Sequence, residues 1–194
     1  MKKYNSRIKT LLIINIVLLF NLVFCISLKS DSLSFYDYSA LDINGKLVEM
    51  DSFKGKNILI VNVASKCGYT PQYKDLQKLY ETYKENLVIL GFPSNDFLWQ
   101  EPGTSEDIKL FCKREYGVNF PIFDKIHVKG RGQHPIFQWL SDSNKNGWND
   151  EPPKWNFNKY LLNPKGKLIN VFGSKIEPLD TLITNNFINT NLVK

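Results

Sequence analysis

The distribution of apolar and polar residues divides the chain into strands and helices. In "LDINGKLVEMDSF", residues 41–53, apolar residues alternate on both sides of Asn44–Gly45. This pattern predicts a β-hairpin with a two-residue turn. Residues 57–65 and 87–92 are nearly uninterrupted apolar runs, which are typical of strands that are buried on both faces of a sheet.

A helix is predicted between these two strands, over residues 70–86. Thr70 suits the N-cap position, and Pro71 suits the first helical position. Its apolar face consists of residues that recur at helical spacing, namely Tyr73, Leu76, Leu79, Tyr80 and Tyr83. A strand, a helix and a strand in this order indicate a right-handed parallel crossover.

The remaining segments complete an α/β pattern. They are predicted as a helix over residues 105–116, a short helix over 134–142, a β-hairpin over 155–173 that turns at Pro164–Gly166, and a helix over 178–189. Thr104 and Asp107 resemble a capping box at the start of the first of these helices. The last helix is predicted to bury one face, formed by Leu179, Leu182, Ile183 and Phe187. The order predicts one α/β sandwich domain over residues 34–194, with a mixed sheet.

Residues 1–27 form a separate leader. A basic head precedes an apolar run from Leu11 to Ser27, which has the length of a signal-peptide core and is short for a transmembrane span. The leader therefore predicts entry into the secretory pathway, with an uncleaved membrane anchor as the alternative. Secretion, the endomembrane system and an organelle reached through it all stay open as destinations.

The net charge of +6 comes mostly from this leader. Four of the 25 basic residues lie in it and no acidic residue does, which leaves 21 basic against 19 acidic residues in the rest of the chain. Such a balanced body does not indicate a nucleic-acid partner.

Three cysteines carry the candidate chemistry: Cys25 in the leader, Cys67 and Cys112. Two body cysteines and two histidines are too few and too scattered for a zinc site. Cys67 follows a predicted buried strand and precedes a predicted helix start, where free N–H groups favour a thiolate. A buried structural cysteine is the alternative. Because Thr70 stands three residues after Cys67, a local C-x-x-C disulfide is impossible.

Three segments in order resemble the signatures of the glutathione peroxidase family. They are "NVASKCGYT" (62–70), "FPSNDFLWQEPG" (92–103) and "WNF" (155–157). A fourth, "IKLFCKREYGV" (108–118), resembles the segment with the resolving cysteine in the thioredoxin-dependent branch. The resemblance extends from about residue 35 to residue 189. It implies a thioredoxin-like fold, with a central mixed sheet flanked by helices and an N-terminal β-hairpin.

The resemblance also implies the site residues. Cys67 corresponds to the peroxidatic residue, and Gln100, Trp155 and Asn156 correspond to the family's catalytic glutamine, tryptophan and asparagine. The last three side chains offer neutral donors that suit a thiolate and a departing oxygen. Cys112 corresponds to the resolving cysteine, and the alternative is a buried thiol on a helix face. No metal and no bound cofactor are implied.

The implied reaction reduces hydrogen peroxide and organic hydroperoxides, lipid hydroperoxides included, through a Cys67 sulfenic acid. Cys112 then forms a disulfide with Cys67, and thioredoxin reduces it. Since a disulfide needs Cα atoms within about 7 Å, the helix around Cys112 is predicted to unwind partly. A glutathione-dependent peroxidase without a resolving cysteine and a thiol peroxide sensor or redox relay are the alternatives. The short segment "KGRGQ" (129–133) resembles the monomeric branch. Membrane contact is expected only through the leader or lipid substrates.

The chain departs from the family pattern at Ser94, Asp96 and Leu98, where the family usually has "FPCNQFG". The lost cysteine lies outside the expected cycle. The charge of Asp96 is expected to disfavour the Cys67 thiolate. Leu98–Trp99 replaces a flexible glycine-containing pair, which is expected to alter the shape of the loop.

Overall fold

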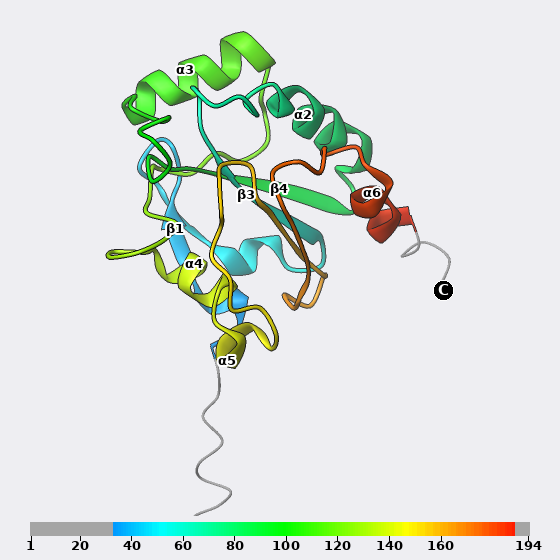
Figure 1. Cartoon of the computed structure of the whole chain (residues 1–194). Helices are drawn as coiled ribbons and strands as arrows, with labels where there is room; N and C mark the ends of the chain where they lie inside the picture. Colours follow the sequence, from blue (N-terminus) through cyan, green and yellow to red (C-terminus); the bar gives the residue numbers. More distant parts are fainter. Residues whose placement is uncertain (1–32, 189–194) are drawn as a thin grey trace, which may run out of the picture. The chain divides into compact units, whose positions relative to one another are not determined.

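The structure of the protein, a computed structural model, describes residues 33–188 (Figure 1). The predicted leader and the last residue of the predicted C-terminal helix lie outside this part of the chain. Within residues 33–188, no helix combines the length and the apolar character that crossing a membrane requires.

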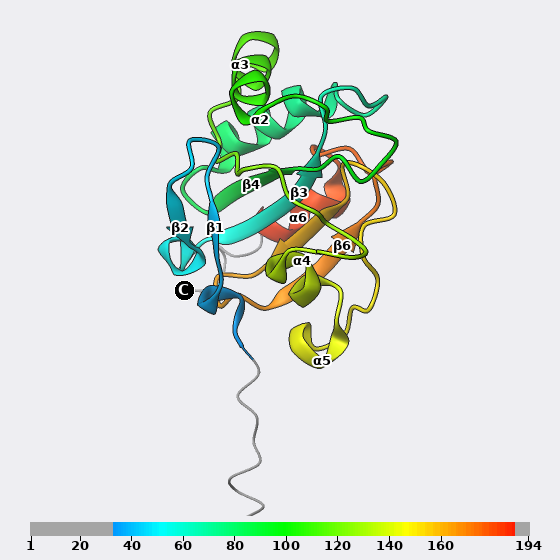
Figure 2. The same ribbon diagram turned by 90° about the vertical axis from the view of Figure 1, so that its left-hand side faces the viewer.

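A mixed sheet forms the centre of the fold (Figure 1, Figure 2). Its strands in spatial order are β4 (Leu87–Pro93), β3 (Asn57–Val63), β5 (Lys159–Leu162) and β6 (Leu168–Phe172). β3 runs parallel to β4, whereas β5 is antiparallel to both of its neighbours. Val63 pairs with Pro93, so the two parallel strands end together at one edge of the sheet.

The sheet separates two apolar cores. Leu59 and Val61 of β3 belong to one core, and Ile58 and Ile60 belong to the other, because successive side chains of a strand point to opposite faces. The first core is covered by α2 (Gln72–Tyr83), α3 (Ser105–Tyr116) and α6 (Thr181–Ile188), and the second by α4 (Pro135–Leu140) and the hairpin of β1 (Ser39–Leu41) and β2 (Leu47–Glu49). The predicted mixed sheet with flanking helices is confirmed.

The predicted hairpin is confirmed, but the predicted two-residue turn is wrong. The N–H group of Asp42 donates to the carbonyl of Lys46 at 2.8 Å, and the N–H group of Gly45 donates to the carbonyl of Asp42 at 2.9 Å. The loop therefore holds three residues, and Gly45 ends it at φ +79°. The Asp42 carboxylate accepts the N–H groups of Asn44 and Lys46, which favours this longer loop.

Other predicted boundaries also need correction. The α3 boundaries and its Thr104–Asp107 capping box agree with the prediction. α2, however, begins at Gln72 and ends at Tyr83, so it is shorter than predicted at both ends. On α6, Ile183 is buried but Leu182 is 58% exposed, so Leu182 does not belong to the buried face; the side chain of Phe187 is outside the described part. The sequence pattern also missed three short elements: the 3-10 helices Phe35–Asp37 and Met50–Phe53, and α5 (Ser143–Asn146).

Candidate active site

Cys67 lies in the turn that joins β3 to α2, and its side chain is 7% exposed. The Thr70 hydroxyl accepts the N–H group of Cys67 at 2.9 Å and donates to the carbonyl of Ala64 at 2.8 Å. Thr70 therefore fixes the turn, which explains why its side chain does not cap α2. The N–H group of Tyr69 points to the Cys67 sulfur at 3.5 Å. The thiol thus faces a main-chain donor at the N-terminal end of α2.

Two other loops are attached to the same edge of the sheet. The N–H group of Lys66 donates to the carbonyl of Gln100 at 2.9 Å. The buried Asn62 of β3 donates its amide to the carbonyl of Trp155 at 2.9 Å. The N–H group of Phe157 donates to the carbonyl of Asn62 at 2.6 Å. These contacts bring the loop of Gln100 and the "WNF" segment to the strand end that carries Cys67.

The side chains of Gln100 and Asn156 meet directly. The Asn156 amide donates to Oε1 of Gln100 at 2.9 Å. Asn156 is fully buried, and its Oδ1 atom has no protein hydrogen-bond partner in the described chain. Because Gln100 accepts through its oxygen, its NH₂ group remains oriented to donate to another acceptor. Two of the sequence-predicted residues therefore form one neutral polar pair.

Trp155 is half-buried against the core that contains Cys67. Its ring lies 5.6 Å from that of Phe97, between ring centroids, and the Lys129 ammonium lies 4.1 Å from the centroid of Phe97. The aromatic pair therefore links the "WNF" segment to the loop after β4. Three separate segments thus bring the four predicted residues to the same end of the sheet: the turn of Cys67, the loop of Gln100, and the segment of Trp155 and Asn156.

Cys112 lies on α3, on the side that faces the core to which Cys67 also belongs. It is 2% exposed and, like Cys67, a free thiol. Burial raises the pKa of Cys112 to about 11, and the neighbouring Tyr73 hydroxyl opposes that rise. Tyr73 is itself fully buried between α2 and α3, and its hydroxyl has no nitrogen or oxygen partner in the described chain. The predicted resolving thiol thus lies on the buried face of a helix, and burial favours its protonated form.

The departures from the family pattern have local explanations. Asp96 turns its carboxylate to the following segment, where it accepts from the His127 ring at 2.6 Å and from the N–H group of Val128 at 2.7 Å. Partial burial works to raise the pKa of Asp96, but these hydrogen bonds lower it overall. The carboxylate of Asp96 is therefore hydrogen-bonded to residues 127–129. The sequence, which suggested an effect of this charge on Cys67, did not reveal these partners. Leu98 and Trp99 adopt φ values of +51° and +52° and are exposed.

The sequence pattern did not predict a buried lysine that contacts the "WNF" segment. Lys159 of β5 is fully buried. Its ammonium donates to the carbonyl of Phe157 at 2.9 Å and to Oε1 of Gln72 at 2.7 Å. Burial lowers the pKa of Lys159 to about 8, against the opposing charge of Glu177. A lysine within the buried run "NKYLL" was the signal that could have identified it, since buried lysines are rare without partners.

A second missed residue is Glu101, which follows Gln100. It is fully buried, and its Oε1 atom accepts from the Ser65 hydroxyl at 2.5 Å. Its Oε2 atom has no hydrogen-bond partner in residues 33–188, and burial raises the pKa of the carboxyl group despite the Ser65 hydrogen bond. Glu101 therefore connects the loop of Gln100 to Ser65, which precedes the turn of Cys67.

Comparison with known proteins gives consistent results. The family model described as glutathione peroxidase matches residues 35–141. A glutathione peroxidase of Lactococcus lactis subsp. cremoris is 48% identical over 147 residues, which cover 75% of this chain and 93% of the relative. A glutathione peroxidase-like peroxiredoxin 2 of Saccharomyces cerevisiae is 46% identical over 146 residues, which cover 75% and 90% of the two chains.

A solved structure matches over most of the chain as well. The crystal structure of Trgpx in apo form has a TM-score of 0.64 and 35% sequence identity, over 82% of this chain and 95% of that one. The predicted thioredoxin-like fold and the predicted family are both confirmed. The chain belongs to the glutathione peroxidase family.

Proposed function

We propose that Cys67 reduces hydroperoxides in a thiol-dependent peroxidase cycle. The Cys67 thiolate attacks one oxygen of the O–O bond, and the other oxygen leaves as alkoxide or hydroxide and takes up a proton. The products are a Cys67 sulfenic acid and an alcohol or water. The observation that carries this proposal is the convergence of Cys67, Gln100 and the "WNF" segment at the end of β3. Their neutral donors suit the thiolate and the departing oxygen.

Cys112 is proposed to resolve the sulfenic acid. Its thiolate attacks the Cys67 sulfur, hydroxide leaves and is protonated to water, and a Cys67–Cys112 disulfide forms. Cys112 is buried within α3. The helix therefore opens at this step, so that the thiol can reach Cys67. A dithiol protein of the thioredoxin type then reduces the disulfide. Several relatives, among them those from Saccharomyces cerevisiae, carry the name glutathione peroxidase-like peroxiredoxin, which supports this branch over glutathione.

A Cys112→Ser variant tests the cycle. With purified thioredoxin, thioredoxin reductase and NADPH, the wild-type protein consumes NADPH continuously when hydrogen peroxide is added. The variant is expected to reduce one equivalent of peroxide and then stop, because a sulfenic acid forms at Cys67 but cannot be resolved. Cys67→Ser is the matched control, and it should not react at all.

The result also separates the alternatives. Unchanged steady-state turnover of Cys112→Ser with thioredoxin would refute the resolving role. Turnover of the variant with glutathione alone would instead establish the glutathione-dependent cycle, through a mixed disulfide at Cys67. A protein that oxidises a partner but never turns over would be a relay.

We further propose that the protein acts as a monomer along the secretory route, without a bound cofactor, on hydrogen peroxide and organic hydroperoxides that include those of lipids. The basic and apolar composition of residues 1–27 supports entry into that route. Sequencing the N-terminus of the native protein tests it: a start near residue 28 is expected, and a start at Met1 indicates an uncleaved anchor.

A further inference from the structure

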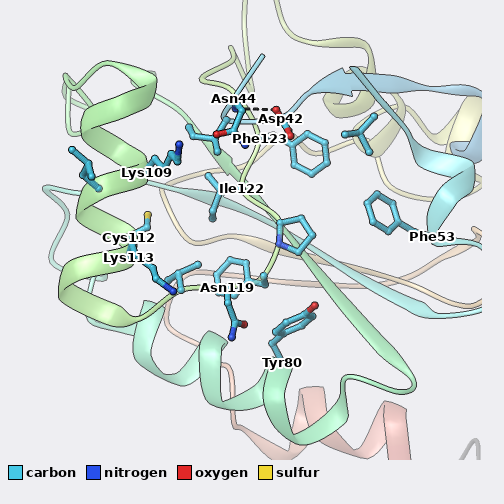
Figure 3. A pocket seen from close by; sticks show the side chains of 16 residues that line it. Asp42, Asn44, Phe53, Tyr80, Lys109, Cys112, Lys113, Asn119, Ile122 and Phe123 are labelled. Carbon is cyan, nitrogen blue, oxygen red and sulfur yellow. Dashed lines mark hydrogen bonds between the residues drawn. The ribbon is translucent and has the colours of Figure 1, made fainter. Parts of the chain in front are cut away.

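A cavity of about 650 Å³ lies beside Cys112 (Figure 3). It is formed between α3, residues 42–44 at the start of the hairpin loop, and the segment 118–123. The side chains that line it include Cys112 but not Cys67, Gln100, Trp155 or Asn156. The cavity is therefore a second site, distinct from the peroxide site, and it shares with the proposed cycle only the helix of the resolving cysteine.

The walls of this cavity are mainly apolar. The side chains that supply them include Val48, Phe53, Tyr80, Val118, Phe120 and Ile122. A concave apolar space of this volume is in the range that proteins use for small organic ligands. Leu110, one further lining residue, is exposed at the edge. A ligand with an apolar body would remove these surfaces from water.

The α3 side of the cavity is positively charged. Lys109 and Lys113 stand four residues apart on one face of the helix, where both line the cavity (Figure 3). Glu106 pairs with Lys109 at 3.7 Å, but both side chains are exposed, so this pair contributes little. On the opposite side, Asp42 is the acidic lining residue, and its carboxylate already accepts two main-chain N–H groups. The charge therefore favours an anionic head group at α3.

We propose that this cavity binds a small amphiphile with one anionic head group and an aliphatic body, such as a long-chain carboxylate. Bound there, the ligand holds α3 closed and slows the release of Cys112. The second part rests on the proposed function of Cys112, whereas the first does not. The ligand contacts both α3, which must open, and residues 118–123, against which α3 is packed.

The expected size of the effect follows from linkage. A ligand that binds only the closed state stabilises it by RT ln(1 + [L]/Kd). At a free concentration ten times its Kd, such a ligand lowers the fraction of open α3 about tenfold. Formation of the disulfide should then slow about tenfold, while formation of the sulfenic acid at Cys67 keeps its rate.

Amide hydrogen exchange of the full chain tests the site without reference to the reaction. The probe is dodecanoate, and dodecyltrimethylammonium, with an aliphatic chain of equal length and a cationic head, is the matched control. Dodecanoate is expected to slow exchange in the peptides of residues 105–116 by severalfold, and the cation is not. The double variant Lys109→Glu, Lys113→Glu should lose this protection. Exchange in the peptides of residues 1–27, measured in the same experiment, reports any binding of either probe to the apolar leader.

The outcomes are separable. Absence of protection by dodecanoate, or equal protection by the cation or in the charge-reversed variant, would overturn the site. The regulatory part is read by acid quenching after a peroxide pulse and mass spectrometry of Cys67 and Cys112, with and without dodecanoate. A disulfide that forms at the same rate in both cases, despite protected amides, would overturn that part. A disulfide that never forms without dodecanoate would instead refute the proposed resolving role and leave the exchange result standing.

Discussion

Replacement of the buried Lys159 by methionine should make the free energy of unfolding depend differently on pH. In the folded protein the pKa of Lys159 is lowered from 10.5 to about 8, mainly by burial. The unfolded chain therefore binds more protons than the folded chain between pH 8 and 10.5. Stability from this group rises with pH across that window. Below pH 8 the folded state carries the full penalty of a buried ammonium.

The magnitude follows from the same shift. A difference of one pKa unit corresponds to 1.36 kcal/mol, so the shift of Lys159 from 10.5 to about 8 amounts to about 3 kcal/mol. Methionine does not titrate, and it fills a similar volume. It also leaves the carbonyl of Phe157 and Oε1 of Gln72 without their donor, which costs about 1–3 kcal/mol at every pH. The stability of the variant relative to the wild type should therefore fall as the pH rises. The fall should amount to about 3 kcal/mol between pH 7.5 and pH 10.5.

Urea unfolding at intervals between pH 7.5 and 10.5, in a phosphine reductant, measures this difference. Burial raises the pKa values of Cys112 and Tyr160, so their ionisation lowers the free energy of unfolding as the pH rises. Both residues are present in both proteins, and their contributions cancel in the difference. Lys165→Met removes an exposed lysine from the same hairpin and controls for the loss of one positive charge. A difference between wild type and Lys159→Met that stays constant across the window, or that shrinks with pH, would refute the reasoning.

Two further predictions concern α3 and the second hairpin. Thr104→Ala removes the N-cap of α3 and should destabilise the helix by about 1 kcal/mol. Because the helix then opens more easily, peroxide-driven disulfide formation should become up to about fivefold faster. Quenched-flow mass spectrometry measures the rate, and a slower rate would contradict helix opening. Gly166→Ala should lower the free energy of unfolding by about 2 kcal/mol, because the new Cβ atom lies 2.6 Å from the Tyr36 ring at a φ of +75°. Gly173→Ala, whose Cβ atom meets nothing within 4 Å, is the control in urea unfolding, and equal losses in the two variants would contradict the steric argument.

The sequence predicted those parts of the fold that depend on neighbouring residues. The apolar runs at residues 57–65 and 87–92 correspond to β3 and β4, because a strand buried on both faces is apolar along most of its length. The capping box of Thr104 and Asp107 placed the start of α3 correctly, since both partners lie within one turn. The motif order identified the family, and through it the residues that meet at the sheet edge.

Other features escaped prediction, either because two local arrangements compete for one side chain or because the partner lies far away in the chain. Thr70 suits a helix N-cap, but its hydroxyl is used by Cys67 and Ala64 instead. Lys159 is stabilised by Gln72, which is 87 positions away, and no local pattern reveals such a partner. Leu98 adopts a left-handed conformation that residues with a Cβ atom disfavour by about 1–2 kcal/mol. A contact between distant residues thus decides the case of Lys159, whereas a competing local turn decides that of Thr70.

Helix α3 controls both the position and the reactivity of Cys112 in the proposed cycle. While the helix is closed, burial raises the pKa of Cys112 to about 11, so the thiol is protonated at neutral pH and is a poor nucleophile. Opening exposes it to water and removes that burial. Its pKa then returns toward the ordinary value, and the thiolate fraction rises about a hundredfold. One motion thus carries the thiol toward Cys67 and activates it, whereas a closed α3 keeps Cys112 buried, protonated and protected from oxidants.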